Sequence, residues 1–399
     1  MKDILHPISL TVALIGLACL LRDLPARRRD TAWAALVAVY LLSALSFLFS
    51  ISSMWRAIDE ALGARNLAVP LAMSCVVALL AGQQIVLSYW SSPADRARRM
   101  SWYWLGAGAV VVAALFVLFF LLTPAVQRPT DFTLYYAHDH VYAAYLTVYI
   151  SAYTLAEGYL SVASWRLAGR SPRAAVRVGL RTVAVGAAVT LGYSAVRIGN
   201  VIAAAMGTSL TGWEDFAWIS GDLGTILTLV GWLIPTLTAQ ARNTSYRWGL
   251  RRAHRQLHPL WLAFYHVVPE IALTPSGSMA DDRSLIQGIP FKVYRRVVEI
   301  RDGQTAVRPY LDHDTRQASE QRHRAAGLSG DELHAAVTAD QIRAALAAHT
   351  QGTPPARPTD FADQNMESRH PIEDLDALRA IARHFARHDH PELPETVRT

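Results

Sequence analysis

The polar side chains that stand out within the long apolar segments of this 399-residue chain are Glu157, Arg197, Asn200 and Asp222. Ionisable groups are costly in apolar surroundings, so Glu157, Arg197 and Asp222 mark candidate functional positions, and Asn200 lies close behind Arg197. Arg197 and Asp222 fall at similar depths in neighbouring segments, and we expect them to form an ion pair inside a helix bundle. That pair either joins two helices or belongs to a ligand or ion site. Glu157 either pairs with Arg181 or accepts protons in a relay.

A second polar group stands where two apolar segments begin. His138, Asp139 and His140 precede one segment, while Glu214 and Asp215 precede another. Together they could form an acidic outer mouth. A His-x-His pair is a weak metal signal without further ligands, so we expect a solvated surface and no metal site.

Seven apolar segments could position these side chains. About 20 apolar residues cross the roughly 30 Å hydrocarbon core of a bilayer, and a spanning segment must be helical to satisfy its own backbone hydrogen bonds. The segments are 4–21, 32–53, 67–89, 102–123, 142–165, 176–205 and 216–239. The sequence therefore predicts an all-α fold, with a seven-helix integral membrane bundle over residues 1–240.

The arginines predict the orientation of this bundle. They cluster in the loops after the first, third, fifth and seventh segments, whereas the opposite side carries few basic residues: Lys2, Arg56, Arg65 and Arg128. Positive charge favours the cytoplasmic side. We therefore expect a multi-pass protein of the cell membrane, with its N-terminus outside and its C-terminal half in the cytoplasm.

The C-terminal half has the patterns of soluble helices. We expect a mainly helical cytoplasmic domain over 241–350, a Pro-rich disordered linker over 351–371, and an amphipathic helix with a tail over 372–399. The segment 232–273 joins the two halves. We interpret it as a transmission hinge, in which Pro259 opens a new helix. Its candidate residues are Arg251, Arg252, Pro259, Trp261 and Phe264.

Composition excludes several functions. Cys19 and Cys75 both lie in apolar segments and predict neither a disulfide nor a metal site. The formal charge of +6 comes mainly from loop arginines, so we expect no nucleic-acid partner. The chain contains no Gly-rich phosphate loop, HExxH, GxSxG or CxxC motif. We therefore expect no enzymatic activity and no cofactor; the expected partners are the lipid bilayer and a cytoplasmic regulatory protein.

Two stretches carry a family resemblance: HPLWLAFYHVVPEIAL and, some 20 residues later, FKVYRRVVEIRDGQTAVRPYLD. They resemble an actinobacterial family of seven-span membrane proteins described as transporters, with a C-terminal domain of unknown function. The resemblance is most specific over residues 257–312. It implies transport, and the regulators often encoded beside such proteins imply regulation as well. It assigns no catalytic or ligand residue.

Three functions remain open on the sequence. The first is a sensor or signalling scaffold that couples the bundle to a cytoplasmic partner, favoured by the large C-terminal half and its terminal amphipathic helix. The second is a transporter that uses Glu157, Arg197 and Asp222. The third is a structural membrane anchor without a ligand. The sequence does not identify the ligand or the partner.

Overall fold

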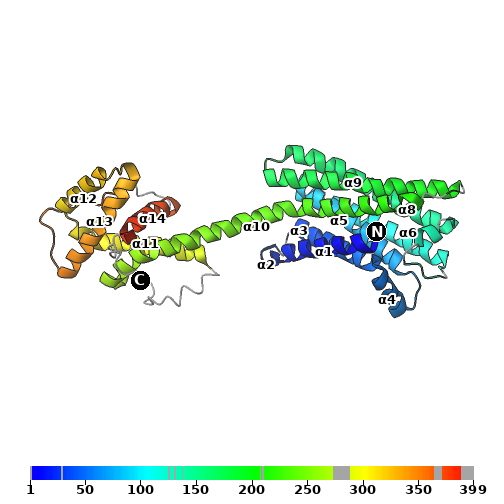
Figure 1. Cartoon of the computed structure of the whole chain (residues 1–399), viewed down its shortest axis with the longest axis horizontal. Coiled ribbons are helices and arrows are strands. Elements are labelled where there is room, and N and C mark those ends of the chain that lie inside the picture. The colour runs from blue at the N-terminus through cyan, green and yellow to red at the C-terminus, as the bar shows by residue number, and fades with distance from the viewer. Residues whose placement is uncertain are drawn as a thin grey trace, which may run out of the picture. The chain divides into compact units, whose positions relative to one another are not determined.

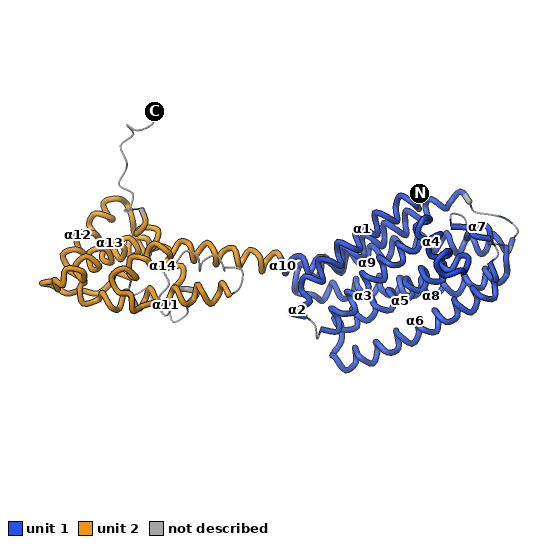
Figure 2. The backbone as a smooth tube through the Cα atoms, turned by 90° about the horizontal axis from the view of Figure 1, so that it is seen from below, with its two compact units in different colours: residues 1–240 blue, residues 241–399 orange. Residues whose placement is uncertain are grey.

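The chain divides into two compact units, residues 1–240 and 241–399 (Figure 2). The computed structural model describes residues 2–27, 30–124, 126–129, 132–136, 138–206, 208, 211–272, 288–363 and 371–387. Within these ranges the regular secondary structure is helical, which agrees with the expected all-α class. The boundary between the units lies inside one helix, α10 (Glu214–Val267).

Unit 1 consists of long helices that lie side by side, with short helices between some of them (Figures 1 and 2). In chain order they are α1 (Lys2–Leu21), α2 (Leu24–Arg27), α3 (Thr31–Ser50), α4 (Ser52–Leu62), α5 (Ala68–Ser91), α6 (Ala94–Leu122), α7 (Phe132–Tyr135), α8 (His140–Arg170), α9 (Ala174–Ala205) and the first part of α10. Aliphatic and aromatic side chains of these helices form two buried clusters in the unit.

In the described part of the chain, six helices are long and apolar enough to cross a membrane: α1, α3, α5, α6, α9 and α10. Each overlaps one of the predicted spans, so a membrane location is supported for this part of the chain. The predicted fifth span, 142–165, lies in α8, which is 31 residues long but not apolar enough to be counted. Its tyrosines and Glu157 lower its hydropathy, and several of them face the interior of the unit.

The helices α9 and α10 approach each other closely at glycines. The Cα atoms of Gly179 and Gly186 on α9 lie against the backbone of Gly231 and Gly224 on α10. Small residues permit this kind of close packing between membrane helices. The contact fixes the first part of α10 within unit 1.

Unit 2 packs the second part of α10 against four further helices. These are α11 (Ile289–Val307), α12 (His313–Ala325), α13 (Gly330–Gln351) and α14 (Pro371–Arg387). Leu257, Leu260 and Phe264 of α10 are fully buried in the core of this unit. The amphipathic C-terminal helix contributes Leu378 and Ile381 to the same core.

Two expectations about this half were wrong. Pro259 does not open a helix; it lies inside α10, where its exposed position leaves the buried stripe of Leu257 and Leu260 intact. The predicted disordered linker 351–371 is packed against the unit at residues 361–363, since Phe361 and Asp363 are buried. Asp363 accepts a 2.9 Å hydrogen bond from Arg301 of α11, which ties this segment to the unit. Residues 364–370 lie outside the described ranges.

Asp340 joins α13 to α12. Its Oδ2 accepts hydrogen bonds from Ser319 Oγ at 2.7 Å and lies 2.9 Å from His323 Nε2. Burial alone would raise the pKa of this carboxyl, but the hydrogen bonds from Ser319 and His323 and the positive charge of Arg322 hold its pKa below the usual range. The carboxylate form of Asp340 therefore stabilises the folded unit.

We expect Asp340→Asn to destabilise the α12–α13 contact by about 1–3 kcal/mol at neutral pH. Because the folded-state pKa is lowered, this contribution is complete above the ordinary Asp pKa of about 4 and is lost as the pH falls below it. The amide protection factors of α12 and α13 in the full chain measure the loss. Asp302→Asn, on the exposed side of α11, is the control. Equal protection in both variants at pH 7 would contradict the prediction.

Candidate functional site

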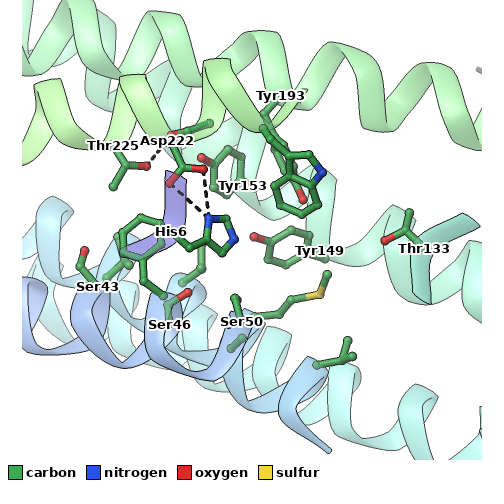
Figure 3. A pocket seen from close by; sticks show the side chains of 18 of the residues that line it. His6, Ser43, Ser46, Ser50, Thr133, Tyr149, Tyr153, Tyr193, Asp222 and Thr225 are labelled. Atoms are coloured by element: carbon green, nitrogen blue, oxygen red, sulfur yellow. Dashed lines mark hydrogen bonds and ion pairs between the residues drawn. The ribbon is translucent and has the colours of Figure 1, made fainter. Parts of the chain in front are cut away.

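Unit 1 contains a cavity of about 280 Å³ among its helices (Figure 3). Both polar and apolar side chains line it. The polar and aromatic ones include His6, Ser43, Ser46, Ser50, Gln83, Tyr149, Tyr153, Glu157, Tyr193, Glu214, Trp218, Asp222, Thr225 and Thr228. Two of the four predicted intramembrane residues, Glu157 and Asp222, are therefore wall residues of one cavity.

Asp222 on α10 is bound by two side chains of α1. His6 Nδ1 lies 3.1 Å from one carboxylate oxygen, and Ser9 Oγ donates a 2.6 Å hydrogen bond to the other (Figure 3 draws the His6 contacts). All three side chains are buried. The helix α1 is thus attached to α10 through a polar contact that also forms part of the cavity wall.

The expected Arg197–Asp222 ion pair does not form. Arg197 instead makes a bidentate pair with Glu214, at 2.7 Å and 3.0 Å, and Asn200 donates a 3.1 Å hydrogen bond to the same carboxylate. Glu214 lies at the start of α10, next to the face of α9 that carries Arg197 and Asn200. The similar predicted depths of Arg197 and Asp222 in the bundle did not make them partners, because the Asp222 side chain faces α1.

Arg197 also lies over two aromatic rings. Its guanidinium carbon is 5.0 Å from the ring centroid of Tyr193 and 5.1 Å from that of Trp218. Cation–π contact in a site with little water is worth up to about 2 kcal/mol or more. The rings that support this internal cation also line the cavity.

Glu157 on α8 is buried, but not beside Arg181 as one interpretation held. Arg181 lies over the Trp165 ring, at 5.7 Å from its centroid. Glu157 Oε2 has no hydrogen-bond partner among the residues that the structure describes. A buried carboxyl without an opposite charge is costly, which makes Glu157 the least compensated acid of the cavity.

Three further polar atoms of the cavity wall share this condition. Ser43 Oγ, Gln83 Oε1 and Thr228 Oγ1 are buried and have no hydrogen-bond partner in the described part of the chain. Most buried polar groups in native proteins have partners, so several unsatisfied atoms around one cavity indicate a site for a polar ligand or for water.

One face of α3 and one face of α8 supply hydroxyl groups. Ser43, Ser46 and Ser50 recur at intervals of three and four residues, which places them on one side of a helix. Tyr149 and Tyr153 have the same spacing on α8. In Figure 3 the hydroxyls of these tyrosines are directed toward the His6–Asp222 pair.

Short segments at one end of unit 1 contribute to the cavity wall. Asp59 of α4 accepts backbone hydrogen bonds from Asn66 at 2.7 Å and Leu67 at 3.0 Å. Asn66, which has a positive φ of 60°, donates from its side chain to Val126 O at 2.8 Å. The neighbouring residues Trp55 and Pro129 line the cavity.

The predicted outer mouth is not assembled as a cluster. Asp139 caps the start of α8, accepting from the backbone N–H of Val141 at 2.7 Å, and Glu214 is engaged by Arg197. His138, His140 and Asp215 are exposed. Among the described residues, no group of three or more His, Cys, Asp and Glu could hold a metal ion.

Residues 246–388 match a family of unknown function (DUF6545). No curated protein and no solved structure matches the chain. The expected C-terminal domain of unknown function is thus confirmed for this stretch, which is called the DUF6545 region below.

The five candidate hinge residues lie on α10, and two of them, Trp261 and Phe264, fall within the core of the DUF6545 region. Phe264 is fully buried, and Trp261 Nε1 donates a 2.8 Å hydrogen bond to Glu299. Arg296 stacks over the Trp261 ring at 4.0 Å. Arg251 is partly buried, whereas Arg252 and Pro259 are exposed. The aromatic pair is therefore a core element of the DUF6545 region.

Sequence reasoning missed His6, Ser9 and the three cavity tyrosines. His6 obeys the same rule that singled out Glu157, because it is an ionisable residue inside an apolar segment. It stands near the start of that segment, where sequence position alone does not distinguish an interfacial side chain from an interior one. The tyrosines of α8 have a regular spacing, but that spacing alone does not distinguish a core stripe from a cavity wall.

Proposed function

We propose that this chain is a membrane receptor that couples a small-molecule site in unit 1 to the DUF6545 region on the cytoplasmic side. One observation carries the proposal. The helix α10 supplies Asp222 and Thr228 to the cavity wall, and the same helix supplies Leu257 and Phe264 to the core of the DUF6545 region.

The cavity supports a binding role for unit 1. Its unsatisfied polar atoms, its aromatic wall and its buried acids are features of small-molecule sites, which combine apolar surfaces with a few placed polar groups. The positive-inside rule supports a cytoplasmic DUF6545 region that acts on a regulatory partner. In this proposal the seven-helix arrangement includes α8 as the polar wall of the bundle.

A transporter is the second candidate. It is favoured by the titratable groups of the wall, Glu157 and the His6–Asp222 pair, because ionisable residues within membrane helices often mark ion or proton pathways. Proton flux into proteoliposomes that is abolished by Glu157→Gln would support this function and contradict the receptor. The absence of flux together with coupling between the units would support the receptor.

We expect Asp222→Asn to change hydrogen exchange in the DUF6545 region. The substitution weakens the contacts of Asp222 with α1 and so perturbs α10 at the cavity. In the full chain, reconstituted in nanodiscs, the exchange rates of the amides in 250–267 and 289–307 should change about two-fold or more, which corresponds to a few tenths of a kcal/mol. Asp215→Asn, exposed on the same helix, is the matched control.

A flexible insertion separates coupling from general destabilisation. Residues 241–246 of α10 are exposed, so six Gly and Ser residues after Asn243 interrupt the helix outside both cores. In a chain that carries this insertion, Asp222→Asn should no longer affect the DUF6545 region. The receptor proposal is wrong if Asp222→Asn alters exchange in unit 1 alone, with or without the insertion.

A further inference from the structure

The charges of the cavity wall do not balance. Three carboxyl groups line it, those of Glu157, Glu214 and Asp222, and His6 is the basic side chain among its lining residues. Arg197 compensates Glu214 through two hydrogen bonds, and His6 is engaged with Asp222. Glu157 is left without an opposite charge in the described part of the unit. The wall therefore favours a ligand that brings positive charge, and it repels an anion.

The unsatisfied atoms require a hydrogen-bond donor. Gln83 Oε1 only accepts hydrogen bonds, and so does Glu157 Oε2 in the carboxylate form that a bound cation favours, while the hydroxyls of Ser43 and Thr228 can accept as well as donate. A primary ammonium group carries three N–H donors and no acceptor. It matches this set of atoms better than a carbonyl compound or a carboxylate does.

The aromatic wall is also suited to a cation. Tyr153, Tyr193 and Trp218 form a continuous series, with ring centroids 5.7 Å apart between the tyrosines and 6.2 Å apart between Tyr193 and Trp218. Two of these rings already support the Arg197 guanidinium. An ammonium group within about 6 Å of such a ring is attracted by its negative face.

The remaining wall indicates an organic cation. The α5 face contributes Val69, Met73 and Leu79, which would contact an apolar body. No grouping of acids and histidines among the described residues is arranged to hold a metal ion. The volume of about 280 Å³ lies just below the usual range of sites for drug-sized ligands, about 300–1,000 Å³.

We infer that the cavity binds a small primary amine in its protonated form, with the ammonium group at Glu157 and the apolar body against α5. This inference rests on the proposed role of the cavity as the ligand site. Glu157 supplies the opposite charge, Gln83 and the hydroxyl groups accept the N–H donors, and the rings of Tyr153, Tyr193 and Trp218 stabilise the charge from the side.

Binding is tested with the full chain in dodecyl maltoside and phosphate buffer, because Tris is itself an amine. The probes are butylamine, hexylamine and 2-phenylethylamine, each compared with the alcohol and the carboxylate of the same carbon skeleton. Thermal unfolding and the fluorescence of the cavity tryptophans report binding. We expect amines to bind, and alcohols and carboxylates to bind at least about ten-fold more weakly, a difference of about 1.4 kcal/mol.

Two variants link binding to the named atoms. Glu157→Gln keeps the size of the side chain and should weaken amine binding by about ten-fold or more. Gln83→Leu removes one acceptor without changing the charge and should cause a smaller loss, which still tests the site if Glu157→Gln fails to fold. Glu60→Gln, exposed on α4, is the control and should bind amines as the natural protein does.

The possible outcomes separate this inference from the receptor proposal. The amine inference is overturned if alcohols or carboxylates bind as tightly as amines, if no amine binds at about 10 mM, or if Glu157→Gln binds amines unchanged. A neutral probe that binds and alters exchange in the DUF6545 region would overturn the amine class and leave the receptor intact. Amine binding without any effect on that region would support the amine class and contradict the receptor.

Discussion

Replacement of Arg197 by Met is expected to destabilise unit 1 by roughly 3–5 kcal/mol, because it leaves the Glu214 carboxylate beside the cavity without its cation. The side chain of Arg197 is 1% exposed and that of Glu214 is 18% exposed. Water therefore replaces little of the lost interaction. The stacking of the guanidinium on Tyr193 and Trp218 is lost in the same variant.

The unfolding of the full chain by SDS in mixed micelles, followed by tryptophan fluorescence, measures this loss. Arg170→Met is the matched control, since Arg170 is exposed at the end of α8. The double variant Arg197→Met with Glu214→Leu should recover part of the stability, because it removes both buried charges instead of one. Similar unfolding midpoints for Arg197→Met and Arg170→Met would show that the pair is not a stabilising contact.

The same pair explains why hydropathy located the polar residues but not their partners. Apolar segments predict helices, and six of the seven predicted spans coincide with helices able to cross a membrane. Which helices are neighbours depends on packing. Asp222 faces α1 and meets His6 and Ser9, whereas Glu214 faces Arg197. A segment-by-segment comparison of depth cannot distinguish these two acids.

The C-terminal half shows a second limit of composition. The segment around 352–363 has the proline and polar content of a linker, yet Phe361 fills the core and Asp363 binds Arg301. These two side chains order the segment despite its linker-like composition. A buried ion pair and a buried aromatic ring hold a short segment in place even without regular secondary structure. The terminal amphipathic helix α14, in contrast, was predictable from its apolar stripe, because that stripe is the face of the helix that is buried in the core.

Replacement of Gly224 by Leu is expected to separate α9 from α10 and to disrupt the cavity. A Cβ atom at Gly224 would lie 2.7 Å from Gly186 O and 2.7 Å from Thr190 N, both of which are backbone atoms of α9. Backbone atoms cannot move aside as a flexible side chain can. Overpacking typically lowers the free energy of unfolding by about 1–3 kcal/mol, occasionally more. We expect a loss at the upper end of this range, because the Leu side chain would meet backbone atoms.

Gly186 of α9 faces Gly224, and a substitution there tests whether the contact between these two glycines causes the loss. A Cβ atom at Gly186 would lie 2.7 Å from Gly224 O and 2.6 Å from the backbone nitrogen of Thr228. Gly186→Leu should therefore cause a loss similar to that of Gly224→Leu, and the double variant should lose much less than the sum, because the helices separate only once. Full additivity would show that the two glycines do not share one contact.

Gly158 on α8 provides the control for helix propensity. A Cβ atom there meets nothing within 4 Å, so Gly158→Leu adds bulk to α8 without entering a neighbour. It should leave the SDS unfolding midpoint unchanged or raise it slightly. Because Asp222 and Thr228 lie on either side of Gly224, displacement of α10 should also abolish the fluorescence response to amines in the Gly224→Leu chain. A Gly224→Leu chain that kept both its midpoint and this response would mean that close α9–α10 contact does not shape the cavity.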